Sequence, residues 1–317
     1  MKKSAVTFAL AISIAFTHVA DAHTPRSGQE WWQALDSANA GSTVRSAHGV
    51  VVLRAPASGR VRIAGGTFLM GSTASELDEA VQLCRREIEE PLCAQDVVSF
   101  LYETIAHDVT LSSYYIDRTE VSVAAYDRCV DSNACTHAGY SPGDKRFDRP
   151  ELPVTTITWD QAFAYCAFAG GRLPTEAEWE FAARGEERRV FPWGDIYNSH
   201  LSNHGVLSLS DETDMDASDG YATLAPVDAF RDGATPEGVL QMAGNVYELV
   251  SDFFGIDPSG FGYPSGAATN PTGQPSGFGH VVRGGSYAAP AARMRGAARQ
   301  GATGTSPQIG VRCAYNG

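Results

Sequence analysis

"LPVTTITWDQAFAYCAFAGGRLPTEAEWEFAARG", residues 152–185, contains two helix starts of the same kind. Thr158 with Gln161, and Thr175 with Glu178, have the spacing of a capping box, in which side chain and backbone exchange hydrogen bonds at the helix N-terminus. Glycines follow each apolar run, and glycine commonly ends a helix because it adopts a left-handed backbone at low cost. The stretch therefore predicts two short helices joined by a tight connection.

The spacing of apolar residues predicts which side of each helix lies in the core. The side chains expected to be buried are Ala162, Phe163, Cys166 and Ala167 in the first helix, and Trp179 and Ala182 in the second.

Upstream of these helices, residues 61–71 have the pattern of a strand interrupted by glycines. Apolar residues then recur at i, i+3, i+4 and i+7 from Leu77 to Cys84, which predicts a helical insertion at residues 75–106. Beyond Pro192, glycine, proline, asparagine and serine dominate. We expect many turns and little regular secondary structure there.

The composition describes a globular, acidic protein. Hydrophobic residues make up 43% and charged residues 19% of 317 residues, so a large core can form. The net charge of −13 argues against a nucleic-acid partner, because phosphate contacts require a basic surface.

Residues 1–22 have the features of a signal peptide. Lys2 and Lys3 precede an apolar run of about a dozen residues, too short for a membrane span of about 20, and Ala20-Asp21-Ala22 is a small-x-small cleavage site. An uncleaved anchor is the alternative. We expect an exported chain, periplasmic or secreted, with no membrane span after cleavage and with residues 23–59 as an N-terminal arm.

An even number of cysteines in an exported protein favours disulfides. The chain has no C-x-x-C motif, which argues against zinc and against a thioredoxin-like site. Other connectivities stay open, but proximity in the sequence suggests Cys84–Cys93 and Cys129–Cys135, leaving Cys166–Cys313.

Seven stretches, in this order, together resemble one family: GGTFLMGS, RTEVSVAAYDRC, the opening stretch, FPWGD, LQMAGNVYELVSDFF, VVRGGSY and GVRCAYNG. The sequence is similar to the sulfatase-modifying factor domain of formylglycine-generating enzymes, over roughly residues 60–316. The resemblance implies an α+β fold, a variant of the C-type-lectin-like architecture with low regular secondary structure, stabilised by disulfides and calcium, over residues 60–317. It also supports the Cys166–Cys313 bridge.

Catalytic members of that family bind copper with two cysteines just after the RGGS motif and oxidise a substrate cysteine. This chain has RGGSYAAPAARMRGAAR there, about three residues shorter, with Ala288, Ala289, Pro290, Ala291 and Ala292 and no cysteine. Copper(I) chemistry of this type needs soft thiolate ligands. Copper is therefore not expected as a cofactor.

Calcium is the cofactor that the resemblance implies. A first set of ligands corresponds to the side chains of Asn203 and Asp219 and the carbonyls of His204 and Tyr221. A second set corresponds to Gln241, the carbonyls of Gly244 and Val246, and the side chain of Glu248; Gln241 stands where relatives have asparagine. Oxygen donors of this kind suit calcium, although acidic loops are most often simply solvated.

Arginines are concentrated after the RGGS motif. In the family they line or brace the substrate groove, and Ser286, Tyr287, Arg293 and Arg295 are the groove candidates here. Arginines in these positions either clamp an anion or brace carboxylates such as Glu176, Glu178 or Asp252. We favour bracing, because a fold with little secondary structure has many backbone carbonyls to satisfy.

Three functions remain open. The favoured one is a binding or scaffolding module that uses the old groove for an exported protein, a peptide or a small molecule. The second is a diverged oxidoreductase that uses the groove with another metal or none. The third is a formylglycine-generating oxidase acting on sulfatases, which the missing thiols disfavour.

Overall fold

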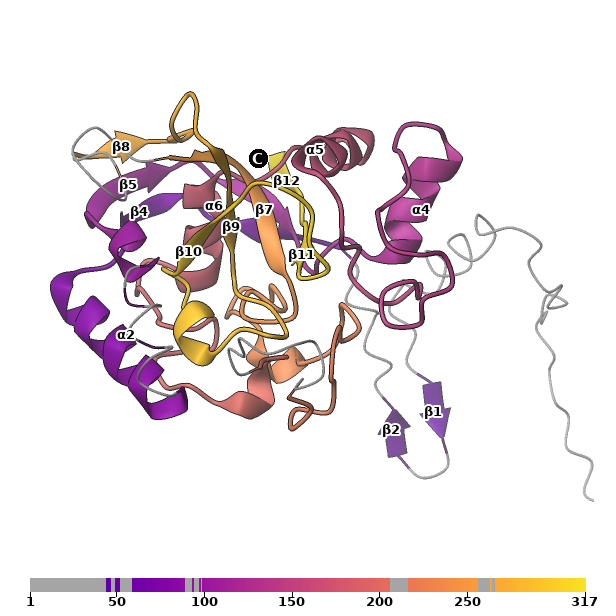
Figure 1. Ribbon diagram of the computed structural model, residues 1–317, viewed down its shortest axis with the longest axis horizontal. Coiled ribbons are helices and arrows are strands. Elements are labelled where there is room, and N and C mark those ends of the chain that lie inside the picture. Colours follow the sequence, from indigo (N-terminus) through magenta and orange to yellow (C-terminus); the bar gives the residue numbers. More distant parts are fainter. Residues whose placement is uncertain are drawn as a thin grey trace, which may run out of the picture. The chain divides into compact units, whose positions relative to one another are not determined.

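The two capping boxes of the opening stretch are both formed. In the computed structural model (Figure 1), Thr158 Oγ1 accepts from the Gln161 amide at 3.1 Å and Gln161 Oε1 accepts from the Thr158 amide at 2.8 Å. Thr175 and Glu178 make the equivalent pair of bonds. Helices α5 (Trp159–Phe168) and α6 (Glu176–Arg184) follow from these caps.

The structure describes residues 44–46, 49–51, 59–88, 99–205, 216–255 and 266–317, together with Cys93, Val97 and Tyr263. Contacts along the chain divide it into two units, residues 1–55 and 56–317. In the first unit, β1 (Val44–Ser46) and β2 (Gly49–Val51) form an antiparallel hairpin within the region expected to be an arm. The predicted signal peptide, 1–22, lies outside the described residues.

The described strands of the second unit form three small sheets. One has the order β10 (Arg299–Ala302), β9 (Gly279–Arg283), β7 (Tyr247–Phe254), β11 (Ile309–Gly310). Another has the order β12 (Ala314–Asn316), β6 (Tyr114–Asp117), β3 (Arg60–Ile63), and the last β4 (Gly66–Met70), β5 (His107–Leu111), β8 (Ala268–Thr269). The glycine-interrupted strand predicted at 61–71 is thus two strands in two sheets.

Helix α6 lies at the centre of this unit, in contact with β4, β5, β7 and β9. All nine of its residues are buried, including Trp179 and Ala182 as predicted. The prediction for α5 was wrong at two positions, because Phe163 is 50% exposed and Ala167 is exposed. Phe163 stacks on Trp159 instead, and Ala162, Tyr165 and Cys166 are the buried residues of this helix.

Helix α4 (Val123–Asp131) packs against α5, and the 3₁₀ helices are short. They are η1 (Leu101–Glu103), η2 (Ser199–Leu201), η3 (Arg231–Gly233) and η4 (Ala291–Arg293). Within the described residues, no helix combines the length and the apolar character needed to cross a bilayer.

Helix α2 (Ala74–Glu87) forms the first part of the insertion predicted at 75–106. A third capping box starts it, between Thr73 and Glu76. Its buried residues, Ala80 and Cys84, pack in one apolar cluster with Cys93, Phe100 and Ala292. The insertion therefore covers η4, beside which α2 lies in Figure 1.

Three disulfides join all six cysteines, in the pairing that proximity in the sequence suggests: Cys84–Cys93, Cys129–Cys135 and Cys166–Cys313. The last joins α5 to the residue before β12 across 147 positions.

Candidate functional site

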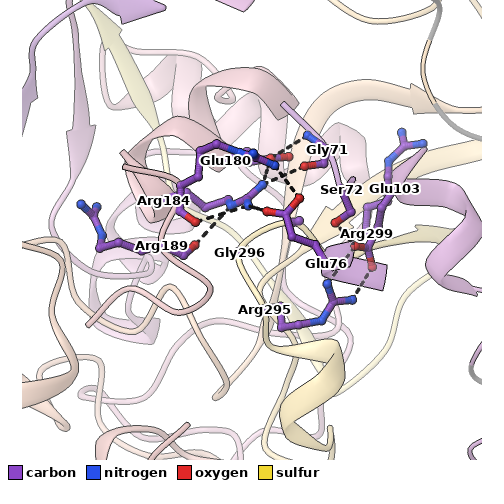
Figure 2. Close-up of polar contacts among 12 residues, drawn as sticks. Gly71, Ser72, Glu76, Glu103, Glu180, Arg184, Arg189, Arg295, Gly296 and Arg299 are labelled. Carbon is purple, nitrogen blue, oxygen red and sulfur yellow. Dashed lines mark hydrogen bonds and ion pairs between the residues drawn. The ribbon is translucent and has the colours of Figure 1, made fainter. Parts of the chain in front are cut away.

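One side of α6 carries charged residues into the core. Glu176, Glu180 and Arg184 are spaced i, i+4, i+8, so they lie along one side of the helix, and all three are buried. Arg184 donates to Glu180 at 2.8 Å and to Glu76 of α2 at 2.7 Å, and Figure 2 shows it between these two carboxylates. Buried charges of this kind persist only when they are paired.

The arginines after the RGGS motif supply the remaining partners. Arg283 binds Glu180 at 2.6 Å and Glu176 at 3.3 Å, and Arg299 grips Glu176 through two bonds of 2.6 and 2.8 Å. Burial works to raise the pKa of Glu180, but Arg283 and Arg184 outweigh it and hold that pKa below its ordinary value. These arginines brace α6 rather than face a ligand.

Two of the carboxylates named as possible brace partners have other roles. Glu178 pairs with Arg172 at 2.6 Å. Asp252 accepts from the Glu176 amide and from Ser251, and burial together with the neighbouring Glu176 charge raises its pKa to about 7.

The groove candidates are distributed over the interior. Arg295 forms a two-bond pair with Glu103, at 2.6 and 3.0 Å, and Ser72 donates to the same carboxylate (Figure 2). Ser286 is fully buried and binds Gln308, while Tyr287 packs in an apolar cluster. Arg293, in η4, is half-buried.

The loop that follows the RGGS motif is tightly packed. Gly285 has a left-handed backbone with φ of +77°, and a Cβ there would lie 2.6 Å from Cγ of Met294. Ala289, Ala291 and Ala292 are all buried, and Ala292 belongs to the same apolar cluster as Cys84 and Cys93. The loop contains no cysteine, and each cysteine of the chain is already bonded to another.

A cavity of about 430 Å³ lies between α2 and the segment 190–197. Leu83 and Glu87 of α2, Phe191 and Tyr197 of the segment, and Arg295 are among its lining residues. Arg295 is thus the groove candidate that lines this cavity, whereas Ser286, Tyr287 and Arg293 do not.

The first predicted calcium set is connected by Asp219. Its carboxylate accepts from the amides of His204 and Tyr221, each at 2.8 Å. The Asp219 hydrogen bond raises the pKa of the His204 ring, against the effect of burial. The Oδ1 atom of Asn203 is buried and has no hydrogen-bond partner among the described residues. Asn203 directly precedes His204, whose amide donates to Asp219, and its unpartnered buried oxygen is a donor of the kind that suits calcium.

In the second predicted calcium set, Gln241 also has a buried oxygen, Oε1, without a partner among the described residues, but Glu248 is already bonded to other side chains. Glu248 is gripped by Arg312 through both carboxylate oxygens and also accepts from the Trp179 indole at 2.6 Å. A cation at this set would therefore rely on Gln241 and the carbonyls of Gly244 and Val246.

Sequence reasoning missed Glu120, which connects the two sets. Asn245 donates to Glu120 at 2.8 Å and accepts from Asn203 at 2.9 Å, and Gln241 also reaches Glu120. Burial raises the pKa of Glu120 to about 8, against the opposing charge of Arg312. In the sequence, Glu120 stands out only by its position in the RTEVSV stretch. It was missed because an acidic residue in the connection between two elements ordinarily lies on the surface.

His200 and His204 are four positions apart, a spacing that on a helix could hold a transition metal, but they do not form such a site in the described residues. His200 lies in η2 and His204 in irregular chain beyond it, so their i, i+4 spacing does not place them on one helix face. No group of three or more His, Cys, Asp or Glu side chains in the described part is arranged to hold a metal.

The sequence profile of the sulfatase-modifying factor enzyme 1-like domain, the FGE-sulfatase family, matches residues 51–317. The chain belongs to this family. The formylglycine-generating enzyme of Bos taurus is 36% identical over 184 residues, which are 55% of this chain and 46% of that protein. The chain thus spans about half the length of that relative.

Other members of the FGE-sulfatase family differ in their described activity. The formylglycine-generating enzyme of Mycobacterium tuberculosis is 29% identical over 298 residues, 80% of this chain and 96% of that protein. The inactive C-alpha-formylglycine-generating enzyme 2 of Mus musculus is 30% identical over 219 residues, 61% of this chain and 68% of that protein. Membership of the family therefore does not decide whether a chain is active.

The fold is shared with a solved structure, PvdO from Pseudomonas aeruginosa. The TM-score is 0.58 at 23% identity, covering 81% of this chain and 94% of PvdO. The predicted α+β fold of the formylglycine-generating-enzyme type is confirmed.

Proposed function

We propose that this FGE-sulfatase family member is an exported binding module and does not generate formylglycine through copper. One observation carries the proposal: all six cysteines are paired in disulfides, and none lies in the loop between Arg283 and Arg299. Copper(I) oxidase chemistry needs soft donors. The loop has alanines and a proline instead, so its residues do not fit copper.

Packing supports the same proposal. In η4, Ala291 and Ala292 are fully buried, and α2 with its disulfide lies against them. A substrate peptide would have to displace the α2 helix to reach this loop. That displacement would break the ion pair between Glu76 and Arg184, in which the arginine side chain is only 2% exposed. Separating a buried pair of this kind is costly.

Calcium belongs to the proposal as a structural cofactor. Asn203, Asp219 and the carbonyls of His204 and Tyr221 would hold the ion, and the unpartnered Oδ1 of Asn203 supports this set. When bound, calcium would neutralise the Asp219 carboxylate and fix the loop after η2. Export is supported by the three disulfides, which form and persist in oxidising compartments.

A second candidate function, a formylglycine-generating oxidase that takes its thiols from outside the loop, is favoured by one contact. Cys84 and Cys93 share an apolar cluster with Ala292, and α2 contacts η4, so this pair, once reduced, would place two thiols near η4. The thiolates of Cys84 and Cys93 would then supply the soft copper ligands that the loop after the RGGS motif lacks.

The test compares the two candidates directly. The purified protein, before and after mild reduction, is loaded with copper(I) and incubated in air with a cysteine-containing sulfatase peptide, while mass spectrometry follows the peptide. We expect no conversion of cysteine to aldehyde in either state. Conversion in both states would overturn the proposal. Conversion only after reduction, lost in a Cys84→Ser, Cys93→Ser variant, would establish the formylglycine-generating oxidase instead.

A further inference from the structure

Two buried arginines, Arg184 and Arg295, line the cavity between α2 and segment 190–197, and we call them its floor. Their charges are already neutralised by glutamates. Arg184 is engaged by Glu180 and Glu76, and Arg295 by Glu103, so neither guanidinium has a free charge to offer a ligand. Figure 2 shows both arginines directed at these carboxylates. An anionic ligand would therefore gain little from this floor.

The rim, by contrast, carries carboxylates with no ion-pair partner among the described residues. Glu79 and Asp195 are exposed at the cavity, and Glu87 is half-buried in it. One oxygen of Glu87 accepts from the Ala291 amide at 2.8 Å, and one oxygen of Asp195 accepts from the Val190 amide at 3.2 Å. These bonds orient the two carboxylates and leave the other oxygen of each for a ligand.

The positive charge at the rim is smaller. Burial raises the pKa of Glu87, against the lowering effects of the Ala291 amide, His204 and Arg86. Of these two positively charged side chains, Arg86, exposed on α2, lines the cavity and His204 does not. Three rim carboxylates against one arginine leave an excess of negative charge over the opening. That excess attracts cations and repels anions over about 8–10 Å at moderate salt.

The walls between rim and floor are apolar. Leu83 on α2 faces Val190, Phe191 and Ile196 on the segment, and Ile196 is 82% exposed. An exposed isoleucine beside a cavity provides a surface for a hydrocarbon chain, whose burial is favourable in proportion to its area. Long cationic side chains combine such a chain with a charged end.

We propose that this cavity binds an aliphatic cation, an ammonium or guanidinium group on a hydrocarbon stem, with the stem against Leu83 and Ile196 and the charge at Glu87, while the exposed Glu79 and Asp195 add longer-range attraction. The source is a lysine or arginine side chain of a polypeptide or a free amine. The inference rests on the proposed function, since it names the ligand class of the binding module.

Calorimetric titration of the full chain tests the site with three probes. N-acetylarginine methylamide represents a peptide-borne cation, butylguanidine a free cation of the same single charge, and N-acetylcitrulline methylamide the neutral isostere of the first. We expect the cations to bind at least ten-fold more tightly than the citrulline compound, with affinity falling as salt rises. The tighter of the two cations identifies the natural source, and either order supports the site.

Matched variants locate the binding. Glu87→Gln keeps an acceptor for the Ala291 amide, and we expect it to weaken cation binding about ten-fold, because charged hydrogen bonds are the stronger ones. Glu79→Gln should weaken it about three-fold, as exposed charges contribute less. Asp78→Asn is the control, since Asp78 is exposed on the same helix but does not line the cavity.

Equal binding of the citrulline compound would overturn the inference. So would unchanged affinity in both glutamine variants, or an equal loss in Asp78→Asn. Because binding rather than turnover is measured, these outcomes are separate from the peptide-oxidation test of the proposed function. Unaltered melting of each variant shows that the fold is intact.

Discussion

Replacing Arg295 by methionine separates a structural brace from a ligand clamp. The Arg295 side chain is 5% exposed and that of Glu103 is 1% exposed, and two bonds join them. Methionine keeps much of the aliphatic stem but leaves the Glu103 carboxylate buried with Ser72 as its remaining side-chain donor. Breaking a buried ion pair in this way costs about 3–5 kcal/mol, which is a large part of the usual stability of about 5–15 kcal/mol.

Urea unfolding followed by tryptophan fluorescence measures this loss. Adding Glu103→Gln to Arg295→Met removes the unpaired charge while keeping an acceptor for Ser72. We therefore expect the double variant to be more stable than Arg295→Met alone, by about 1–3 kcal/mol. Arg86→Met, an exposed arginine of the same cavity, is the control and should change stability by about 0.5 kcal/mol or less.

The reasoning would be refuted by a loss below about 1 kcal/mol in Arg295→Met. An additive loss in the double variant would refute it equally, because it would mean that the two side chains do not depend on each other. Either result would return Arg295 to the role of a ligand clamp.

Four further outcomes are expected. Asn203→Ala should abolish the calcium-dependent rise in melting temperature, which in the parent corresponds to about 2.7 kcal/mol at a hundred-fold excess over Kd; a rise that persists in the variant argues against the first calcium set. The pKa of Asp252 is about 7 in the folded protein and about 4 in the unfolded chain, so between these pH values the folded protein keeps a proton that the unfolded chain has lost. The stability that this proton contributes is fully present below pH 4 and is lost as pH rises through 7. Unfolding at pH 4–8 should therefore show a decline of a few kcal/mol relative to Asp252→Asn, and parallel curves would contradict the assigned burial. Thr175→Ala should cost about 1 kcal/mol in urea unfolding through loss of the capping box, and no loss would mean that α6 is held by its packing alone. Replacing Cys166 and Cys313 together by alanine should cost about 4–5 kcal/mol, and an unchanged midpoint would show that the bridge does not constrain the unfolded chain.

Local signals in the sequence predicted the helices around 152–185 because caps and glycine stops depend on a few neighbouring residues. The exposure of Phe163 was missed because the pattern of a single helix does not say which part of its surface the rest of the chain covers. Strand β7, eight residues long, lies in the region expected to be mostly turns. Its pairing with β9 and with β11 is long-range and leaves little trace in local composition.

The candidate site was predictable only in its residue types. Arginines after the RGGS motif suggested either clamps or braces, and partners such as Glu103 and Glu180 lie about 100 or more positions away in the sequence. Glu120 was missed for the same reason, since its amide neighbours come from another segment. The cavity arises from contact between α2 and residues 190–197, which no spacing within either segment indicates.

Strand β6 pairs on one side with β3 and on the other with β12, so the first and last strands of the larger unit flank one strand. Their backbones are thus about 10 Å apart across the sheet. Because the two strands are so close, the unit could be inserted as a domain into a surface loop of a host protein. The host loop would need only a few additional residues to join both ends of the unit. Fusion partners attached at Arg60 and at Asn316 would likewise be held near each other, and resonance energy transfer between them would report whether the sheet is closed.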